Sequence, residues 1–199
     1  MGFNGDVVVY RSPLAPADLD ASVGTSGHPI FGEWTGNDGW RVVHVRHDDD
    51  PYEYDREWLT GFAAATGHPV LVCNVFESDV ARLRGVAGAL FVDGWLDPDA
   101  ATHALAGHWF QKIADEMNED PYYVGGEFGS KQFYDALAVE VRGALDRARP
   151  DVVEAVVAWA RANGYDVASE EVDRHLQRKA TPYVESLFFD LLRLIGLMS

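Results

Sequence analysis

The stretch Val70-Leu71-Val72-Cys73-Asn74-Val75-Phe76 determines the fold prediction, because it is a nearly unbroken apolar run rich in β-branched residues. Such a run predicts a buried strand at the centre of a sheet. Shorter apolar runs at 7–10, 40–45, 80–84 and 89–95 predict further strands around it. Because helical segments do not alternate regularly with these runs, we expect a mostly antiparallel sheet.

Local signals between the strands predict one helix and one long loop. Residues 55–66 carry apolar side chains at three- and four-residue spacing, Asp55 suits the N-cap, and Gly67 suits the residue after the helix end. Residues 24–39 are punctuated by Gly and predict a loop.

The second half of the chain predicts helices. We expect them at 98–117, at 131–148, from Pro150 to Gly164, briefly from Ser169, and from Thr181-Pro182 onward. The prediction is therefore an α+β protein with a single domain over 1–199, strand-rich in 1–97 and helical in 98–199. The last helix is apolar most of the way round, so it packs in the core or against another copy of the chain. The second option predicts a homo-oligomer formed through the C-terminal helix.

The charge of the chain restricts its partners. The 32 acidic and 16 basic residues give a net charge of −16. A field of this sign disfavours nucleic acids and anionic membranes, and it attracts a cation or a basic protein. No apolar stretch approaches the roughly 20 residues that span a bilayer. The single cysteine excludes an internal disulfide, and the start of the chain lacks a secretory pattern, so we expect a cytoplasmic protein.

Two groups of carboxylates are candidate binding residues. Asp48, Asp49 and Asp50 follow a predicted strand, and Glu77 and Asp79 follow the central strand. Clustered carboxylates can bind a divalent cation, although the calcium-loop pattern is not matched here. The alternatives are a solvated acidic turn at 48–50, and carboxylates that accept hydrogen bonds from turn amides at 77–79.

The segment around 118–129 interrupts the helices with aromatic and Gly residues. Tyr122, Tyr123 and Phe128 make it a candidate contact loop for a partner. The tract 125–131 does not match a phosphate-binding loop, because a Ser separates its last Gly from the Lys.

The remaining polar residues do not predict a catalytic or cofactor site. His103 and His108 lie five residues apart, which on a helix separates them by about 140°, so they do not form a metal-binding pair. Cys73 lies inside the predicted central strand, where burial makes a thiol inert. We therefore predict no metal site and no cofactor.

Three stretches carry a resemblance to known proteins: residues 1–6, residues 66–79 (TGHPVLVCNVFESD) and residues 182–192 (PYVESLFFDLL). Together they resemble a group of small, acidic, uncharacterised actinobacterial proteins whose central strand ends in a D-S-D-like step. Glu77 stands here in place of the first Asp of that step. In size, charge and α+β layout the chain is also similar to immunity proteins of bacterial toxin systems, which implies a protein partner.

Two functions follow as hypotheses. The first is a non-catalytic protein that binds a basic protein, as an immunity protein binds its toxin. The second is a small-molecule or divalent-metal-dependent enzyme that uses carboxylates at strand ends. The second requires Asp48–Asp50 to lie close to Glu77 and Asp79, which the sequence does not show.

Overall fold

A six-stranded antiparallel sheet organises the structure, a computed structural model that describes residues 4–14, 30–46, 55–118, 120, 124 and 130–199. The strand order is β2-β3-β1-β4-β5-β6, so β4 lies inside the sheet between β1 and β5, as predicted. The strands are β1 (Gly5–Arg11), β2 (Ile30–Thr35), β3 (Trp40–Arg46), β4 (Val70–Phe76), β5 (Val80–Ala87) and β6 (Leu90–Leu96). The helices are α1 (Arg56–Thr66), α2 (Pro98–Met117), α3 (Ser130–Ala162), α4 (Ser169–Leu176) and α5 (Val184–Leu194).

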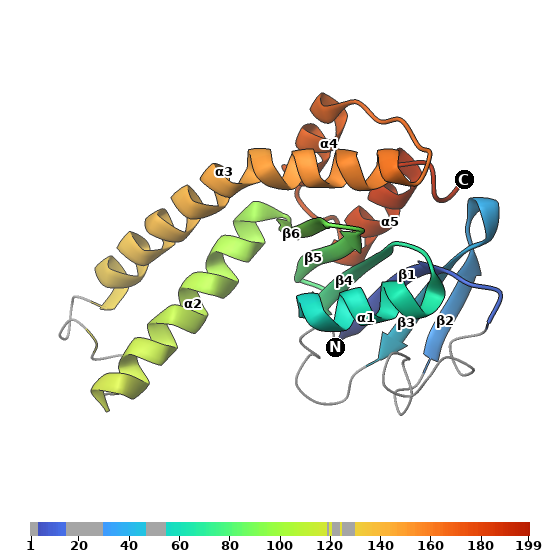
Figure 1. The fold of residues 1–199 in the computed structure, drawn as a ribbon. Helices are drawn as coiled ribbons and strands as arrows, with labels where there is room; N and C mark the ends of the chain where they lie inside the picture. The colour runs from blue at the N-terminus through green and yellow to red at the C-terminus, as the bar shows by residue number, and fades with distance from the viewer. Residues whose placement is uncertain (1–3, 15–29, 47–54, 119, 121–123, 125–129) are drawn as a thin grey trace.

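Helices cover both faces of the sheet (Figure 1). Because side chains alternate along a strand, Val7 and Val9 join one core and Val8 and Tyr10 join the other. The first core is the larger and includes residues from the end of α3, from α4 and from α5. The second lies under α1, which contributes Leu59 and Phe62. The strand-rich and helical halves therefore share one core, and the α+β prediction is confirmed.

The predicted ends of α1 are confirmed in detail. Asp55 is the N-cap, and its carboxylate accepts a hydrogen bond from the Trp58 N–H at 2.7 Å. Gly67 follows the helix with a φ of 69°, a left-handed conformation that glycine adopts without steric cost.

Strand β2 was missed by the sequence prediction, which placed a loop over 24–39. Residues 30–35 pair with β3, and the register shifts between Ile30 and Gly32. No residue of β2 is buried. An edge strand that is exposed on this scale lacks the apolar alternation that identifies buried strands.

The sequence prediction of two helices, at 131–148 and from Pro150, was also wrong. Both segments belong to α3, a single helix of 33 residues that contains Pro150. Figure 1 shows that α3 bends between its diagonal first part and the part that lies over the sheet. Proline lacks the N–H for the bond to the carbonyl four residues earlier, here that of Asp146, and so bends a helix without always ending it.

The first part of α3 runs beside α2, and together they project from the rest of the molecule (Figure 1). We call α2 with residues 130–149 of α3 the helical hairpin. At its base, Asp99 forms ion pairs with Arg142 and Lys179. Hydrogen bonds from Lys179 and Arg142 lower the pKa of the Asp99 carboxyl.

The C-terminal helix α5 is covered within the chain. Its residues Val184, Leu187, Phe188, Leu191 and Leu192 are at most 2% exposed. The wide apolar arc of this helix therefore packs in the core, which was one of the two predicted options. Phe189 and Leu194, which widen the arc, are only partly buried, so a homo-oligomer formed through this helix stays a prediction. Among the described helices, none is long and apolar enough to cross a membrane.

Candidate functional site

The two strands that precede the acidic candidate groups are β3 and β4, and their C-terminal ends lie together beside the start of β1. Gly5 at the start of β1 pairs with Arg46 at the end of β3 and with Val75 near the end of β4. The chain therefore enters 47–54 at the end of β3, and β1 separates this strand from β4, which leads into Glu77 and Asp79. Asp48, Asp49 and Asp50 themselves lie outside the described residues, so the convergence of the carboxylates remains a prediction.

Glu77 and Asp79 belong to a tight turn that is built into the fold. The φ angles of Glu77 and Ser78 are 53° and 60°, as expected for the two central residues of a hairpin turn. The Asp79 N–H donates to the Phe76 carbonyl at 3.0 Å, which closes the turn. The side chains of Glu77 and Asp79 are exposed. They are accessible to a partner.

The same turn docks onto the start of α5. The Val184 N–H donates to the Ser78 carbonyl at 3.0 Å, and the Ser78 hydroxyl donates to a Glu185 carboxylate oxygen at 3.1 Å. On the other side, the Glu77 N–H donates to the Asn4 side-chain oxygen. The backbone of this turn is thus held from two sides, which fixes the positions from which the side chains of Glu77 and Asp79 extend.

Several polar side chains are buried within the sheet. The Asn74 amide donates to the Asp6 carboxylate at 2.6 Å, and both residues are at most 3% exposed. Burial lowers the pKa of His44 to about 4, against the opposing effect of Asp6. Burial, followed by the carboxylates of Asp6 and Glu185, raises the pKa of the Cys73 thiol well above its usual value. The prediction of a buried thiol at Cys73 is confirmed, and a thiol of this kind is a poor nucleophile.

Metal-ligating side chains do not gather in the part of the chain that the structure describes. Within it, no group of three or more His, Cys, Asp or Glu side chains is placed to hold a metal ion. His103 instead stacks on Tyr134 across the helical hairpin, with ring centroids 6.5 Å apart and an interplanar angle of 6°. His108 lies edge-on to its neighbour Trp109.

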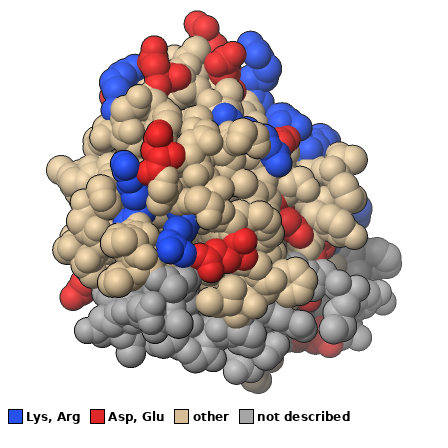
Figure 2. Space-filling model, turned by 90° about the vertical axis from the view of Figure 1, so that its right-hand side faces the viewer, with Lys and Arg blue, Asp and Glu red and all other residues tan. Residues whose placement is uncertain are grey.

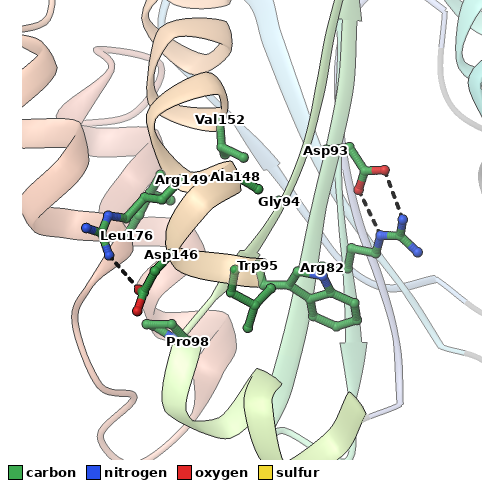
Figure 3. A pocket seen from close by; sticks show the side chains of 11 residues that line it. Arg82, Asp93, Gly94, Trp95, Pro98, Asp146, Ala148, Arg149, Val152 and Leu176 are labelled. Carbon is green, nitrogen blue, oxygen red and sulfur yellow. Dashed lines mark hydrogen bonds and ion pairs between the residues drawn. The ribbon is translucent and has the colours of Figure 1, made fainter. Parts of the chain in front are cut away.

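A cavity of about 200 Å³ lies where β6, the start of α2 and the middle of α3 meet (Figure 3). Two ion pairs lie on opposite sides of it, Arg82 with Asp93 at 2.8 Å and Arg149 with Asp146 at 2.9 Å. The Arg82 guanidinium also lies 5.4 Å from the centroid of the Trp95 ring. The remaining lining residues are Gly94, Pro98, Leu145, Ala148, Val152 and Leu176.

The cavity has the character of a packing junction. Ligand pockets usually enclose about 300–1,000 Å³, and the four charged side chains here are already engaged with one another. Gly94 allows α3 to lie directly on β6, because a side chain at this position would collide with Val152. The sequence prediction missed this junction, since it depends on the unforeseen continuity of α3 through Pro150.

Close to the predicted aromatic contact loop, the structure describes aromatic side chains on the two adjacent helices. Tyr122, Tyr123 and Phe128 lie outside the described residues, between α2 and α3. On the helices themselves, Phe110 contacts Phe133 and Tyr134, with ring centroids 6.0 Å apart in both pairs. Phe133 is 38% exposed and Trp109 is 47% exposed. Aromatic side chains are thus accessible on the helical hairpin.

Comparisons with known proteins give one partial likeness. No family model and no solved structure matches the chain. The chain is similar to curated proteins named probable cobalt/nickel-exporting P-type ATPase from Mycobacterium bovis and Mycobacterium tuberculosis, with 32% identity over 123 residues. The match covers 56% of this chain and 18% of each of those proteins, so the chain spans less than a fifth of their length.

Proposed function

We propose that the protein binds a basic protein partner and does not catalyse a reaction, and that an immunity protein which neutralises a basic toxin is the most specific form of this function. The observation that carries the proposal is the uneven placement of charge along the chain. Segments 15–29, 47–54 and 77–79, which we call the acidic segments, contain no Lys or Arg. Their carboxylates are Asp18, Asp20, Asp48, Asp49, Asp50, Glu53, Glu77 and Asp79.

These eight carboxylates equal half of the net charge of −16. Residues 113–130 also carry five carboxylates and no Lys or Arg. On the face shown in Figure 2, acidic and basic side chains are interspersed and much of the surface is uncharged. Complementary charge accelerates the encounter of two proteins and selects between partners. A partner with a basic patch would therefore be drawn to the acidic segments more than to the face shown in Figure 2.

The test is affinity capture from the host at low salt, followed by identification and purification of the captured protein. We expect a basic protein whose dissociation constant rises at least about tenfold between 50 and 300 mM NaCl, because screening weakens charge attraction. Changing Asp48, Asp49 and Asp50 to Asn, Glu77 to Gln and Asp79 to Asn should weaken binding by a similar factor.

A matched control removes five exposed carboxylates from other surfaces, at Glu116, Glu140, Asp151, Glu154 and Glu170. It changes the net charge by the same amount, from −16 to −11, so equal weakening by both variants would contradict a role for the acidic segments. The immunity form predicts one further result. The captured protein should arrest growth when expressed alone and be harmless when expressed together with this chain.

A second candidate is a divalent-metal-dependent or small-molecule enzyme that uses Asp48, Asp49, Asp50, Glu77 and Asp79. The partial likeness to proteins named as probable cobalt/nickel exporters favours this candidate. Titration calorimetry with Co²⁺, Ni²⁺, Zn²⁺, Mn²⁺, Mg²⁺ and Ca²⁺ tests it. Uptake that disappears when Asp48 and Asp50 are changed to Asn supports a site at these carboxylates, and the absence of heat with all six ions removes the metal-dependent form.

A further inference from the structure

The helical hairpin has little support from the rest of the molecule. Beyond its base, α2 and the first part of α3 lie beside each other and away from the sheet (Figure 1). No residue of α3 before Val153 is buried, although this part of the helix is more than 20 residues long. Helices in proteins are stabilised mainly by the packing of an apolar face. A helix pair that buries so few side chains leaves one side of the pair exposed to solvent.

An apolar stripe marks that side on α2. Leu105, Trp109, Ile113 and Met117 follow one another at four-residue spacing and therefore lie along one side of the helix. Trp109 is 47% exposed and Met117 is 52% exposed, while Leu105 and Ile113 are partly exposed. The stripe extends over about 18 Å at 1.5 Å per residue.

Apolar side chains are also exposed on the first part of α3. Val139 is 73% exposed and Phe133 is 38% exposed. Exposed apolar side chains that gather on one projecting element mark an interaction surface more often than scattered ones do.

The charge of the helical hairpin selects the kind of partner. The two helices of the hairpin contain six acidic and five basic residues, so their net charge is −1 in a chain of net charge −16. A basic protein gains little electrostatic attraction there. A second copy of this acidic chain, by contrast, meets little like-charge repulsion from these two helices, whereas it would meet stronger repulsion at the acidic segments.

We propose that the helical hairpin is a self-association surface, on which two copies of the chain pair hairpin against hairpin as a four-helix bundle. Twofold symmetry makes such a contact self-complementary, so the apolar stripe of each α2 is covered by the hairpin of the other copy. Two helices about 10 Å wide and about 30 Å long present a face of roughly 600 Å² per copy. The total of about 1,200 Å² reaches the lower end of the range for specific, stable interfaces.

The experiment is sedimentation equilibrium of the full chain at about 1 to 100 µM, a range that resolves micromolar dissociation constants. We expect a dimer of about 44 kDa, twice the 22.0 kDa of one chain. Trp109→Glu and Val139→Glu should each raise the dimer dissociation constant at least about tenfold, since each places a charge in an apolar contact. Ala64→Glu, which adds the same charge at an exposed position of α1, should leave the dissociation constant unchanged.

Circular dichroism and thermal melting check that each variant is folded. Val139→Glu is the variant that should stay folded, because an exposed side chain contributes little to the stability of one copy. A wild-type chain that stays monomeric up to 100 µM overturns the proposal, and so does a dimer that tolerates both substitutions. A monomer whose hairpin variants lose binding to a captured protein also overturns it, and assigns the surface to that protein.

The proposal does not depend on the acidic segments. Neutralising Asp48, Asp49, Asp50, Glu77 and Asp79 should leave the dimer intact, and the hairpin substitutions should leave charge-dependent capture of a basic protein intact. The two proposals can therefore fail separately.

Discussion

Trp159 fastens α3 to the middle of the sheet. Its indole N–H lies 3.2 Å from the carbonyl oxygen of Val70 and 3.1 Å from that of Val86, which pair across β4 and β5. Its ring also packs against Trp40, with centroids 5.5 Å apart. The side chain of Trp159 is 1% exposed, so it fills core volume and satisfies two buried acceptors at once.

Replacing Trp159 with Phe should lower the free energy of unfolding by about 2–4 kcal/mol. The change leaves a cavity and removes the donor for two buried carbonyls. Urea denaturation followed by circular dichroism measures the effect. Trp109→Phe is the control because Trp109 is 47% exposed, and the same midpoint for both variants would contradict the role of Trp159.

His44 makes stability depend on pH. Burial lowers its pKa in the folded protein from 6.5 to about 4. Its ring lies near those of Phe31 and Trp34, at centroid distances of 5.6 Å and 6.0 Å. Between pH 6.5 and 4 the unfolded chain therefore binds a proton at His44 that the folded chain does not bind, so stability falls as the pH falls.

The variant His44→Gln isolates this contribution, because glutamine stays neutral throughout. We expect the stability difference between wild type and variant to shrink as the pH is lowered from 7 toward 4.5, since the wild type alone loses the contribution of His44. Urea titrations at several pH values give this difference. Parallel curves for the two proteins would show that His44 protonates equally in the folded and unfolded states.

At the scale of elements, Asp97 fixes the direction in which α2 leaves the sheet. Its carboxylate accepts hydrogen bonds from the Ala100 N–H at 3.1 Å and from the Ala180 N–H at 2.7 Å. The residue is 6% exposed and has a φ of 51°. One side chain thus caps α2 and ties its start to the segment that leads into α5.

Replacing Asp97 with Ala should lower the free energy of unfolding by about 2–3 kcal/mol, because both hydrogen bonds are lost and Ala disfavours this backbone conformation. Asp97→Asn should cost less, because its one oxygen can keep the cap and Asn tolerates positive φ. Chemical denaturation gives the order of the three proteins. An Ala variant as stable as the wild type would exclude this anchoring role.

The elements that the sequence predicted well are those with local signals. Asp55 and Gly67 identify the ends of α1 without any knowledge of the fold, and the apolar run of β4 identifies a buried strand. β2 was missed because its side chains are exposed. The continuity of α3 was missed because Pro150 fits the first turn of a helix as well as a bend within one.

The candidate site likewise has parts that local sequence patterns predict and parts that depend on tertiary structure. The turn at Glu77 and Asp79 follows from the end of β4. The expected alternative was carboxylates that accept hydrogen bonds from turn amides, whereas the Asp79 N–H donates to the Phe76 carbonyl and the Glu77 N–H to the Asn4 side chain. The link from Ser78 to Val184 and Glu185 joins residues more than 100 positions apart, and no local pattern contains it. The projection of the helical hairpin likewise depends on tertiary packing at its base.

At the scale of the whole molecule, the excess of carboxylates opposes folding. A net charge of −16 repels itself in the compact state. The ion pairs of the described residues are mostly at the surface, such as Lys131 with Asp135 at 2.7 Å, and exposed pairs contribute little to stability. Net repulsion should therefore outweigh the ion pairs.

Salt should then stabilise the protein. Raising NaCl from about 10 mM to 0.5 M screens the repulsion, and we expect the melting temperature to rise by several degrees. Differential scanning calorimetry measures this change. A melting temperature that falls steadily with NaCl would mean that attraction within ion pairs exceeds the repulsion among carboxylates.

The bend of α3 determines where the far end of the helical hairpin lies. The 33 residues of this helix extend over about 50 Å, of which about 30 Å lies on the far side of Pro150 from the sheet. A change of about 10° in the bend moves the distant end by about 5 Å. Trp159 anchors the part of α3 that lies over the sheet and Asp97 anchors the start of α2, so a change in the bend would have to move both helices of the hairpin together.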